Sequence, residues 1–141
     1  LPTMPNPFTF ASPPGPVGRL FTNMGISHAA IVPATAKIVI TSGEPGLNLQ
    51  TGELVTDSLE AQFRAAYDTV DAVLKHAGVT NGNFGAYKFT ALLLDMQNEE
   101  LLMSIWRERY PGHTPVFMAF GVKQLGMEGM QVELRAEAIV E

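Results

Sequence analysis

The chain has 141 residues, of which 46% are hydrophobic and 16% charged, with nine Lys or Arg against fourteen Asp or Glu and a net charge of −5. The length fits a single domain, and the charged fraction is below the roughly 25% of ordinary globular domains, so we expect some surface to be buried in an oligomer. The acidic balance and the scattered basic residues argue against nucleic acid as a partner, and the absence of cysteine excludes disulfides, thiolate metal sites and a cysteine nucleophile.

The N-terminal region is rich in proline, and we expect no targeting signal in it. Six of the ten prolines lie in the first sixteen residues, and no basic residue precedes Arg19 to form the charged start of a signal peptide. The prolines argue against a helix, so we expect residues 1–20 to form an extended arm before a domain over residues 21–141. No apolar run approaches the roughly 18 residues that span a bilayer, and we expect a soluble, cytoplasmic protein without membrane contact.

The first half of the domain predicts two strands and a helix. β-branched and small apolar residues over 26–32 and 37–41 predict the strands, which Pro33 separates. Asp57 and Glu60 match an Asp version of the capping box. Apolar residues recur every three or four positions behind them, which predicts an amphipathic helix that ends at Gly78.

The second half predicts strand, helix, strand and strand. Apolar runs over 86–94 and 115–122 predict strands, and between them Glu99 and Glu100 mark the first turn of a helix that Pro111 ends. Strict alternation over 130–140 predicts a last strand with one core face and one polar face. The element order repeats a split βαβ pattern, in which two helices cover one face of a sheet. The scarcity of charge indicates that other subunits cover the opposite face.

Two positions are candidates for chemistry from spacing alone. Glu137 lies on a strand of small apolar residues, so we expect partial desolvation, which favours general acid/base use. The alternative is a simple ion pair with Arg135, two residues away on the same face. Gly43 ends a strand, where a ligand can approach a backbone N–H closely. The three histidines have no metal-ligand spacing, and we expect neither a metal nor a cofactor.

Six short motifs occur in an order that resembles one protein family. They are Ile26-Ser27-His28-Ala29, Ser42-Gly43-Glu44, Thr51 to Val55, Glu60-Ala61-Gln62, Lys88 to Met96, and Glu137-Ala138-Ile139. They are similar to the Tyr-Ser-Gln-Ala, Ser-Gly-Gln, Thr-Gly-Glu-Leu-Val, Glu-Ala-Gln, Lys-Thr-Thr-Val-Phe-Leu-x-Asp-Met and Glu-Ala-Ile motifs of the Rid family, also called YjgF/UK114 or "endoribonuclease L-PSP". The resemblance runs from about Gly25 to the C-terminus.

The resemblance implies an α+β fold of the chorismate-mutase-like type, which we expect as a mixed six-stranded sheet with two helices on one face. It also implies a homotrimer with three sites between subunits. In members that hydrolyse enamines and imines, an Arg binds the substrate carboxylate, a backbone N–H at the Ser-Gly turn contributes to the site, and a Glu on the last strand positions water. Gly43 and Glu137 match the last two.

The departures from the family pattern change the expected substrate. Phe117 stands at the position of the Arg, Ile26 replaces the Tyr, Ala119 replaces a Cys, and Met103 aligns near an Asn. A carboxylate would lose its charge-assisted anchor, while the site gains apolar surface. We therefore expect Glu137 to be catalytic, and the substrate-binding residues to be Ile26, Ser27, Gly43, Met103, Phe117, Ala119 and Arg135.

Three hypotheses remain open at this point. The first is a divergent Rid-type enzyme that acts on an apolar or aromatic small molecule by hydrolysis, tautomerisation, or cyclisation or dehydration in a biosynthetic pathway. The second is a trimer without catalysis that binds hydrophobic ligands or client proteins. The third is a retained imine deaminase in which Arg135 or another cation replaces the missing Arg. Ribonuclease activity fits an acidic chain poorly.

Overall fold

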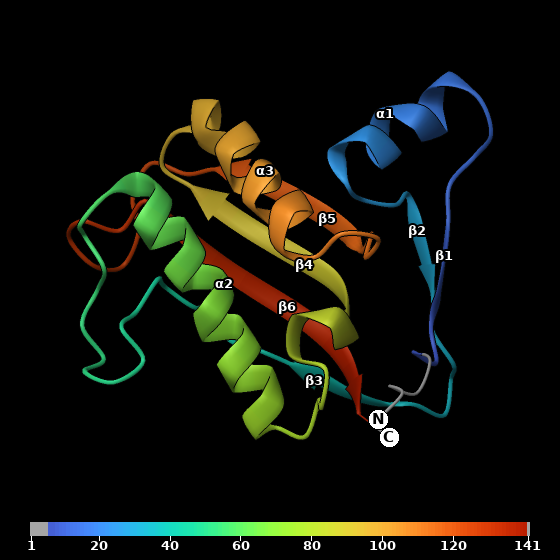
Figure 1. The fold of residues 1–141 in the computed structure, drawn as a ribbon, viewed down its shortest axis with the longest axis horizontal. Helices are drawn as coiled ribbons and strands as arrows, with labels where there is room; N and C mark the ends of the chain where they lie inside the picture. Colours follow the sequence, from blue (N-terminus) through green and yellow to red (C-terminus); the bar gives the residue numbers. More distant parts are fainter. Residues whose placement is uncertain (1–5, 141) are drawn as a thin grey trace.

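The computed structural model describes residues 6–140, and its centre is a mixed four-stranded sheet (Figure 1). The strands are β3 (Lys37–Ile40), β6 (Val132–Val140), β4 (Ala86–Leu93) and β5 (Val116–Gly121), in that spatial order. The β3–β6 and β6–β4 pairs are antiparallel, and the β4–β5 pair is parallel. Strands β3 and β5 are therefore the two edges of the sheet.

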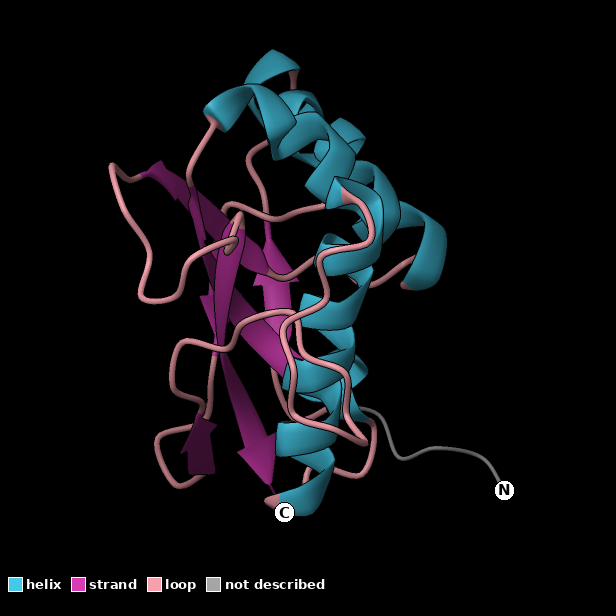
Figure 2. Cartoon of the chain, turned by 90° about the vertical axis from the view of Figure 1, so that its left-hand side faces the viewer, coloured by secondary structure: helices cyan, strands magenta, loops and turns pink. Residues whose placement is uncertain are grey.

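Helices α2 (Leu59–His76) and α3 (Glu99–Arg109) lie side by side on one face of this sheet, and Figure 2 shows them as a separate layer. The predicted α+β class with a mixed sheet is confirmed. Helix α2 begins one residue later than the expected capping box, because the Ser58 side chain, and not that of Asp57, accepts the N–H of Ala61. Short 3₁₀ turns over Gly82–Gly85 and Met96–Asn98 precede β4 and α3.

The N-terminal region contains β1 (Thr9–Ala11), α1 (Pro16–Met24) and β2 (Ala29–Ile31), so the expectation of an arm without helix was wrong. Pro16 lies in the first turn of α1, where the missing N–H of proline is harmless. Gly25 ends the helix with a φ of 89°, a left-handed conformation that glycine adopts without strain. A third helix is thus added to the two expected ones.

The six strands form two sheets instead of one. β1 and β2 make an antiparallel pair, separate from the four-stranded sheet. The residues before β2 reach the larger sheet through a bond from the Ser27 N–H to the Pro115 carbonyl oxygen, 3.0 Å long, just before β5 begins. β2 itself is not paired with β5, so the six strands do not form the single sheet that was expected.

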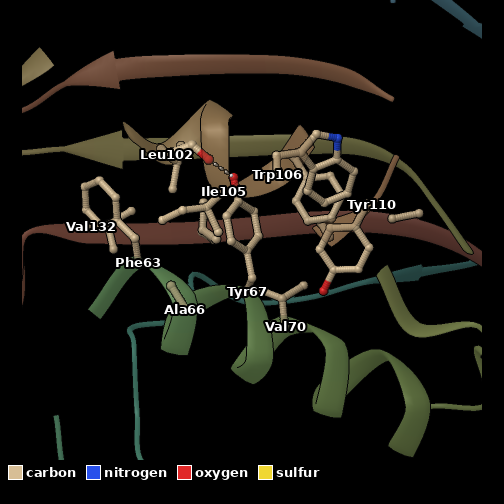
Figure 3. Close-up of a cluster of buried hydrophobic side chains, with 14 of the residues drawn as sticks. Phe63, Ala66, Tyr67, Val70, Leu102, Ile105, Trp106, Tyr110 and Val132 are labelled. Atoms are coloured by element: carbon tan, nitrogen blue, oxygen red, sulfur yellow. Dashed lines mark hydrogen bonds between the residues drawn. The ribbon is translucent and has the colours of Figure 1, made fainter. Parts of the chain in front are cut away.

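The core fills the space between the helices and the sheet (Figure 3). Tyr67 of α2 is fully buried and donates its hydroxyl to the Leu102 carbonyl oxygen of α3 at 2.9 Å. Trp106 of α3 is also fully buried, and its indole N–H donates to the His113 carbonyl oxygen at 3.1 Å. Each large polar aromatic residue therefore has a partner for its polar atom.

Among the described residues, no helix covers the opposite face of the sheet (Figure 2). It exposes large apolar side chains at both edges, namely Ile38 and Ile40 of β3 and Met118 and Phe120 of β5. We call this surface the open face. In the part of the chain that the structure describes, no helix is long and apolar enough to cross a membrane.

Candidate functional site

The predicted site residues fall into two groups at different parts of the sheet. Phe117 and Ala119 lie on edge strand β5, and Ile26, Ser27 and Met103 lie on segments that pack near it. Gly43 follows the other edge strand, β3, and Arg135 and Glu137 lie on its neighbour β6. β4 separates β5 from β6, so one chain does not bring the two groups together.

Phe117 faces the core side of the sheet. It is in register with Phe89, and the two rings stack with centroids 5.6 Å apart and planes 14° from parallel. Trp106 lies edge-on to Phe117 at 6.3 Å. Phe117 and Ala119 are partly buried against the main core. The position expected to hold an Arg is thus filled by a ring that the aromatic core fixes in place.

The other members of the β5 group are buried within the chain. Ile26 and Met103 are 3% and 2% exposed and belong to the main core. Ser27 is also buried, and its hydroxyl donates to the Thr114 hydroxyl at 3.0 Å. Most of the surface of these residues is therefore committed to packing within the chain.

Glu137 lies on the open face with two donors. Its side chain is 19% exposed, and Oε2 pairs with the Lys88 Nζ at 3.0 Å. The Tyr87 hydroxyl donates to Oε1 at 3.3 Å. Among residues 6–140 the ion-pair partner of Glu137 is therefore Lys88, and not Arg135, which is exposed. Burial, followed by the charge of Glu137, raises the pKa of Tyr87 to about 12.

Gly43 lies against the side chain of Glu133. The Glu133 carboxylate occupies the volume that a side chain at position 43 would need. Glu44 exchanges both backbone hydrogen bonds with Leu134, at 2.6 Å and 2.9 Å, which holds this turn against β6. Burial, and then the nearby charge of Glu133, raises the pKa of Glu44. A pair of carboxylates therefore stands next to the predicted Gly43 site.

Sequence reasoning missed four polar residues of this region: Tyr87, Lys88, Glu44 and Glu133. Two of them carried a signal. Lys88 begins the motif Lys88 to Met96, and Glu44 stands where the matching motif has Gln. Glu133 alternates with Arg135 and Glu137 on the polar face of the last strand, but its approach to Gly43 depends on how the turn folds back. Tyr87 had no pattern that pointed to Glu137.

No three His, Asp or Glu side chains within residues 6–140 are grouped to hold a metal ion. His113 is buried beside aromatic rings, and its Nε2 lies 2.7 Å from the Ala86 carbonyl oxygen. Burial lowers the pKa of His113. This histidine has a place in the core and not in a ligand set.

A separate cleft of about 460 Å³ opens at the start of α2. It is lined by Thr56, Ser58, Leu59, Gln62, Asn98, Gly129 and Gln131. None of the predicted site residues lines it. The buried Gln62 amide donates to the carbonyl oxygens of Val55 and Gly129 and accepts the N–H of Gln131, so its polar atoms are used in holding the surrounding loops together.

The fold defines a class of α+β proteins, and comparison with known families identifies it. Residues 23–140 match the model of the endoribonuclease L-PSP family, and the chain belongs to this family, which is also known as the Rid family.

Relatives and a solved structure extend this assignment. A human protein named 2-iminobutanoate/2-iminopropanoate deaminase is 28% identical over 129 residues, which are 92% of this chain and 85% of the relative. A protein of the same name from Escherichia coli K12 is 28% identical over 102 residues, which are 72% and 77% of the two chains. The crystal structure of YyfB, a Rid-family protein of unknown function from Yersinia pestis, has a TM-score of 0.79 at 20% identity and covers 95% of this chain and 99% of that one. This similarity shows a shared fold.

Proposed function

We propose that the chain is a cofactor-independent enzyme that acts on a small metabolite with an apolar or aromatic part. Glu137 serves as general acid/base, and the Gly43 N–H donates a hydrogen bond to the oxygen where negative charge develops. The observation that carries this proposal is Phe117, whose ring stacks on Phe89 at the position where the resemblance predicts a carboxylate-binding Arg. Compatible reactions are hydrolysis, tautomerisation, and cyclisation or dehydration in a biosynthetic pathway of the cytoplasm.

We propose a homotrimer as the active unit, with each site formed between two chains. Two observations support it: the two groups of site residues lie in different parts of the sheet, and the open face exposes four large apolar side chains at its edges. Light scattering after size exclusion tests this directly. Three copies of a 15.3 kDa chain give about 46 kDa, whereas a mass near that of one chain at micromolar concentration would remove the inter-subunit site.

The experiment for the activity is a metabolite screen that compares the wild-type chain with Glu137→Gln. Each protein is incubated with a cell extract, and mass spectrometry identifies compounds that change. We expect wild-type protein to convert an apolar or aromatic compound that the variant leaves unchanged. If compounds bind to both proteins and neither converts them, the alternative of a trimer that binds ligands or clients without catalysis is correct.

Imine deamination is the second candidate. The names of the human and E. coli relatives favour it, and so does the presence of Lys88 and Arg135 on the open face as substitute cations for a substrate carboxylate. We expect weak or absent turnover of 2-iminobutanoate in a coupled keto-acid assay, because Phe117 cannot bind a carboxylate. Turnover equal to that of the human relative would reverse the order of the two proposals. The variant Phe117→Arg tests whether the missing cation is the cause.

A further inference from the structure

Strand β4 carries one extra residue opposite Glu137. Ala86 of β4 is in register with Ala138 of β6, and Lys88 is in register with Glu137, so two steps along β4 correspond to one step along β6. Tyr87 is the additional residue of this β-bulge. Bulges re-aim side chains, and they are frequent next to functional sites. Here the consequence is that Tyr87 and Lys88, although adjacent in sequence, both contact Glu137.

The two contacts involve different oxygens of the Glu137 carboxylate. The Tyr87 hydroxyl donates to Oε1, and the Lys88 ammonium lies 3.0 Å from Oε2, so each oxygen has its own donor. Two donors at different oxygens fix the rotation of a carboxylate as well as its position.

The surroundings of the three residues are apolar. Tyr87 and Ile139 are buried together with Phe8, and the Tyr87 and Phe8 rings have centroids 5.9 Å apart. Ile40 of β3 is in register with Glu137 on its other side. Packing therefore fixes the Tyr87 ring, and the low exposure of Glu137 strengthens its polar contacts relative to those of a solvated pair.

From this geometry we infer that Tyr87 and Lys88 are positioning residues that hold Glu137 as an oriented proton acceptor. The inference rests on the proposed function and makes it more specific, because Glu137 then begins the reaction as a base. It takes a proton from water or from the substrate and returns it in a later step, so no further reagent is needed. The strand 86–93 thereby joins the site, although none of its residues was predicted to do so.

Chemical labelling tests this inference without a substrate. A water-soluble carbodiimide with glycinamide modifies carboxyl groups in their protonated form, and peptide mass spectrometry reports the extent at Glu137 across pH 5–7. The variants are Lys88→Met, Lys88→Arg and Tyr87→Phe. The control is Lys37→Met, which removes a positive charge from the neighbouring strand β3 at a position in register with Val140 and not with Glu137.

We expect Lys88→Met to increase labelling of Glu137 roughly two- to fivefold, the range that partly exposed ion pairs produce. Lys88→Arg should restore the wild-type pH profile, and Lys37→Met should leave it unchanged. Tyr87→Phe should increase labelling by a smaller factor. Equal labelling in wild type, Lys88→Met and Lys37→Met, with all proteins folded and of the same mass, would overturn the inference.

Ultraviolet titration of the tyrosines gives a second measurement. Because Glu137 contributes to the raised pKa of Tyr87, Glu137→Gln should lower the pH at which one tyrosine ionises. An unchanged titration would show that the Tyr87 contact does not exist in solution. Neither experiment uses turnover, so their failure is distinguishable from failure of the proposed function, which the metabolite screen measures.

Discussion

The two groups of site residues are held in place by different kinds of contact. At the β5 edge, Phe117 is fixed by stacking on Phe89 and by the edge of Trp106, and Ile26 is buried in the same core. At the β3 side, Glu137 is held by hydrogen bonding and charge, at the surface of the open face. Folding alone accounts for the apolar group, whereas the polar group contains charges that the core does not require.

Glu44 and Glu133, next to Gly43, are a second example of charged residues that packing does not require. Burial raises the pKa of Glu44, and repulsion by the nearby Glu133 carboxylate raises it further. Such an arrangement lowers stability at neutral pH, and unfavourable charge pairs are concentrated at functional sites. We therefore expect the residues at the β5 edge to serve mainly packing and the polar residues near Gly43 and Glu137 to be available for chemistry.

The largest expected effect concerns Glu137. If the polar group carries the chemistry, Glu137→Gln should reduce turnover of the compound found in the screen by roughly 10²–10⁴-fold, because Gln keeps the shape but does not transfer a proton. The matched control is Glu128→Gln, which changes an exposed Glu in the loop before β6. A folded, trimeric Glu137→Gln protein with unchanged turnover would reject the acid/base role and leave Glu137 as a structural partner of Lys88.

The next effect tests the apolar group through stability. Trp106→Ala should lower the free energy of unfolding by about 3–5 kcal/mol, since it removes a fully buried indole that contacts Phe89 and Phe117 and leaves the His113 carbonyl without its donor. Urea denaturation measures the change. Ser104→Ala on the same helix is the control, because Ser104 is only partly buried and bonds to its own helix. A loss of less than about 1 kcal/mol in the free energy of unfolding would contradict the conclusion that packing holds the residues at the β5 edge in place.

Local patterns predicted the elements well, because each depends on neighbouring residues. The alternation along β6 and the three-to-four spacing along α2 are examples. Helix α1 was missed because its prolines were interpreted as helix breakers, although Pro16 occupies the first turn and an apolar spacing of three and four follows from Val17 to Met24.

The arrangement of the candidate site depends on contacts that no local pattern contains. The family motifs selected Gly43 and Glu137, but the contacts of Glu137 follow from the bulge at Tyr87, which a single sequence does not reveal. The Glu133 carboxylate reaches Gly43 only because the turn after β3 folds back on β6. Phe117 was selected as a site residue, while its stacking in the core follows from the parallel register with Phe89.

A pH dependence of the free energy of unfolding should arise from His113, which lies beside Trp106. His113 is surrounded by the rings of Phe8, Phe10, Phe84 and Trp106, and burial lowers its pKa below the ordinary value of 6.5. Well above pH 6.5 the residue is neutral in both the folded and the unfolded chain. Below it the unfolded chain binds the proton more readily, so stability falls until the lowered pKa of the folded state is passed.

Thermal unfolding measured from pH 8 to pH 5 checks this dependence. His113→Phe should reduce the decrease in melting temperature below pH 6.5, whatever its absolute stability, because it removes the group that titrates. His76→Gln, at an exposed position near the end of α2, is the control and should retain the decrease. The same slope in His113→Phe and in wild type would show that other groups cause it.

The smallest expected effect is a pH dependence of stability that arises from Glu44. Its sign is opposite to that of the effect of His113. Because the folded-state pKa of Glu44 is raised above 4.5, its contribution to stability is present below pH 4.5 and is lost as the pH rises through the raised value. Glu44→Gln should therefore increase the melting temperature slightly at pH 7 and leave it nearly unchanged at pH 4. Glu133→Gln should act similarly, since it removes the other charge of the pair, and Glu53→Gln in the exposed turn should change neither value. An increase that is equal at both pH values would mean that the carboxylates do not interact, and a decrease at pH 7 would show that Glu44 stabilises the fold and does not belong with the groups kept for chemistry.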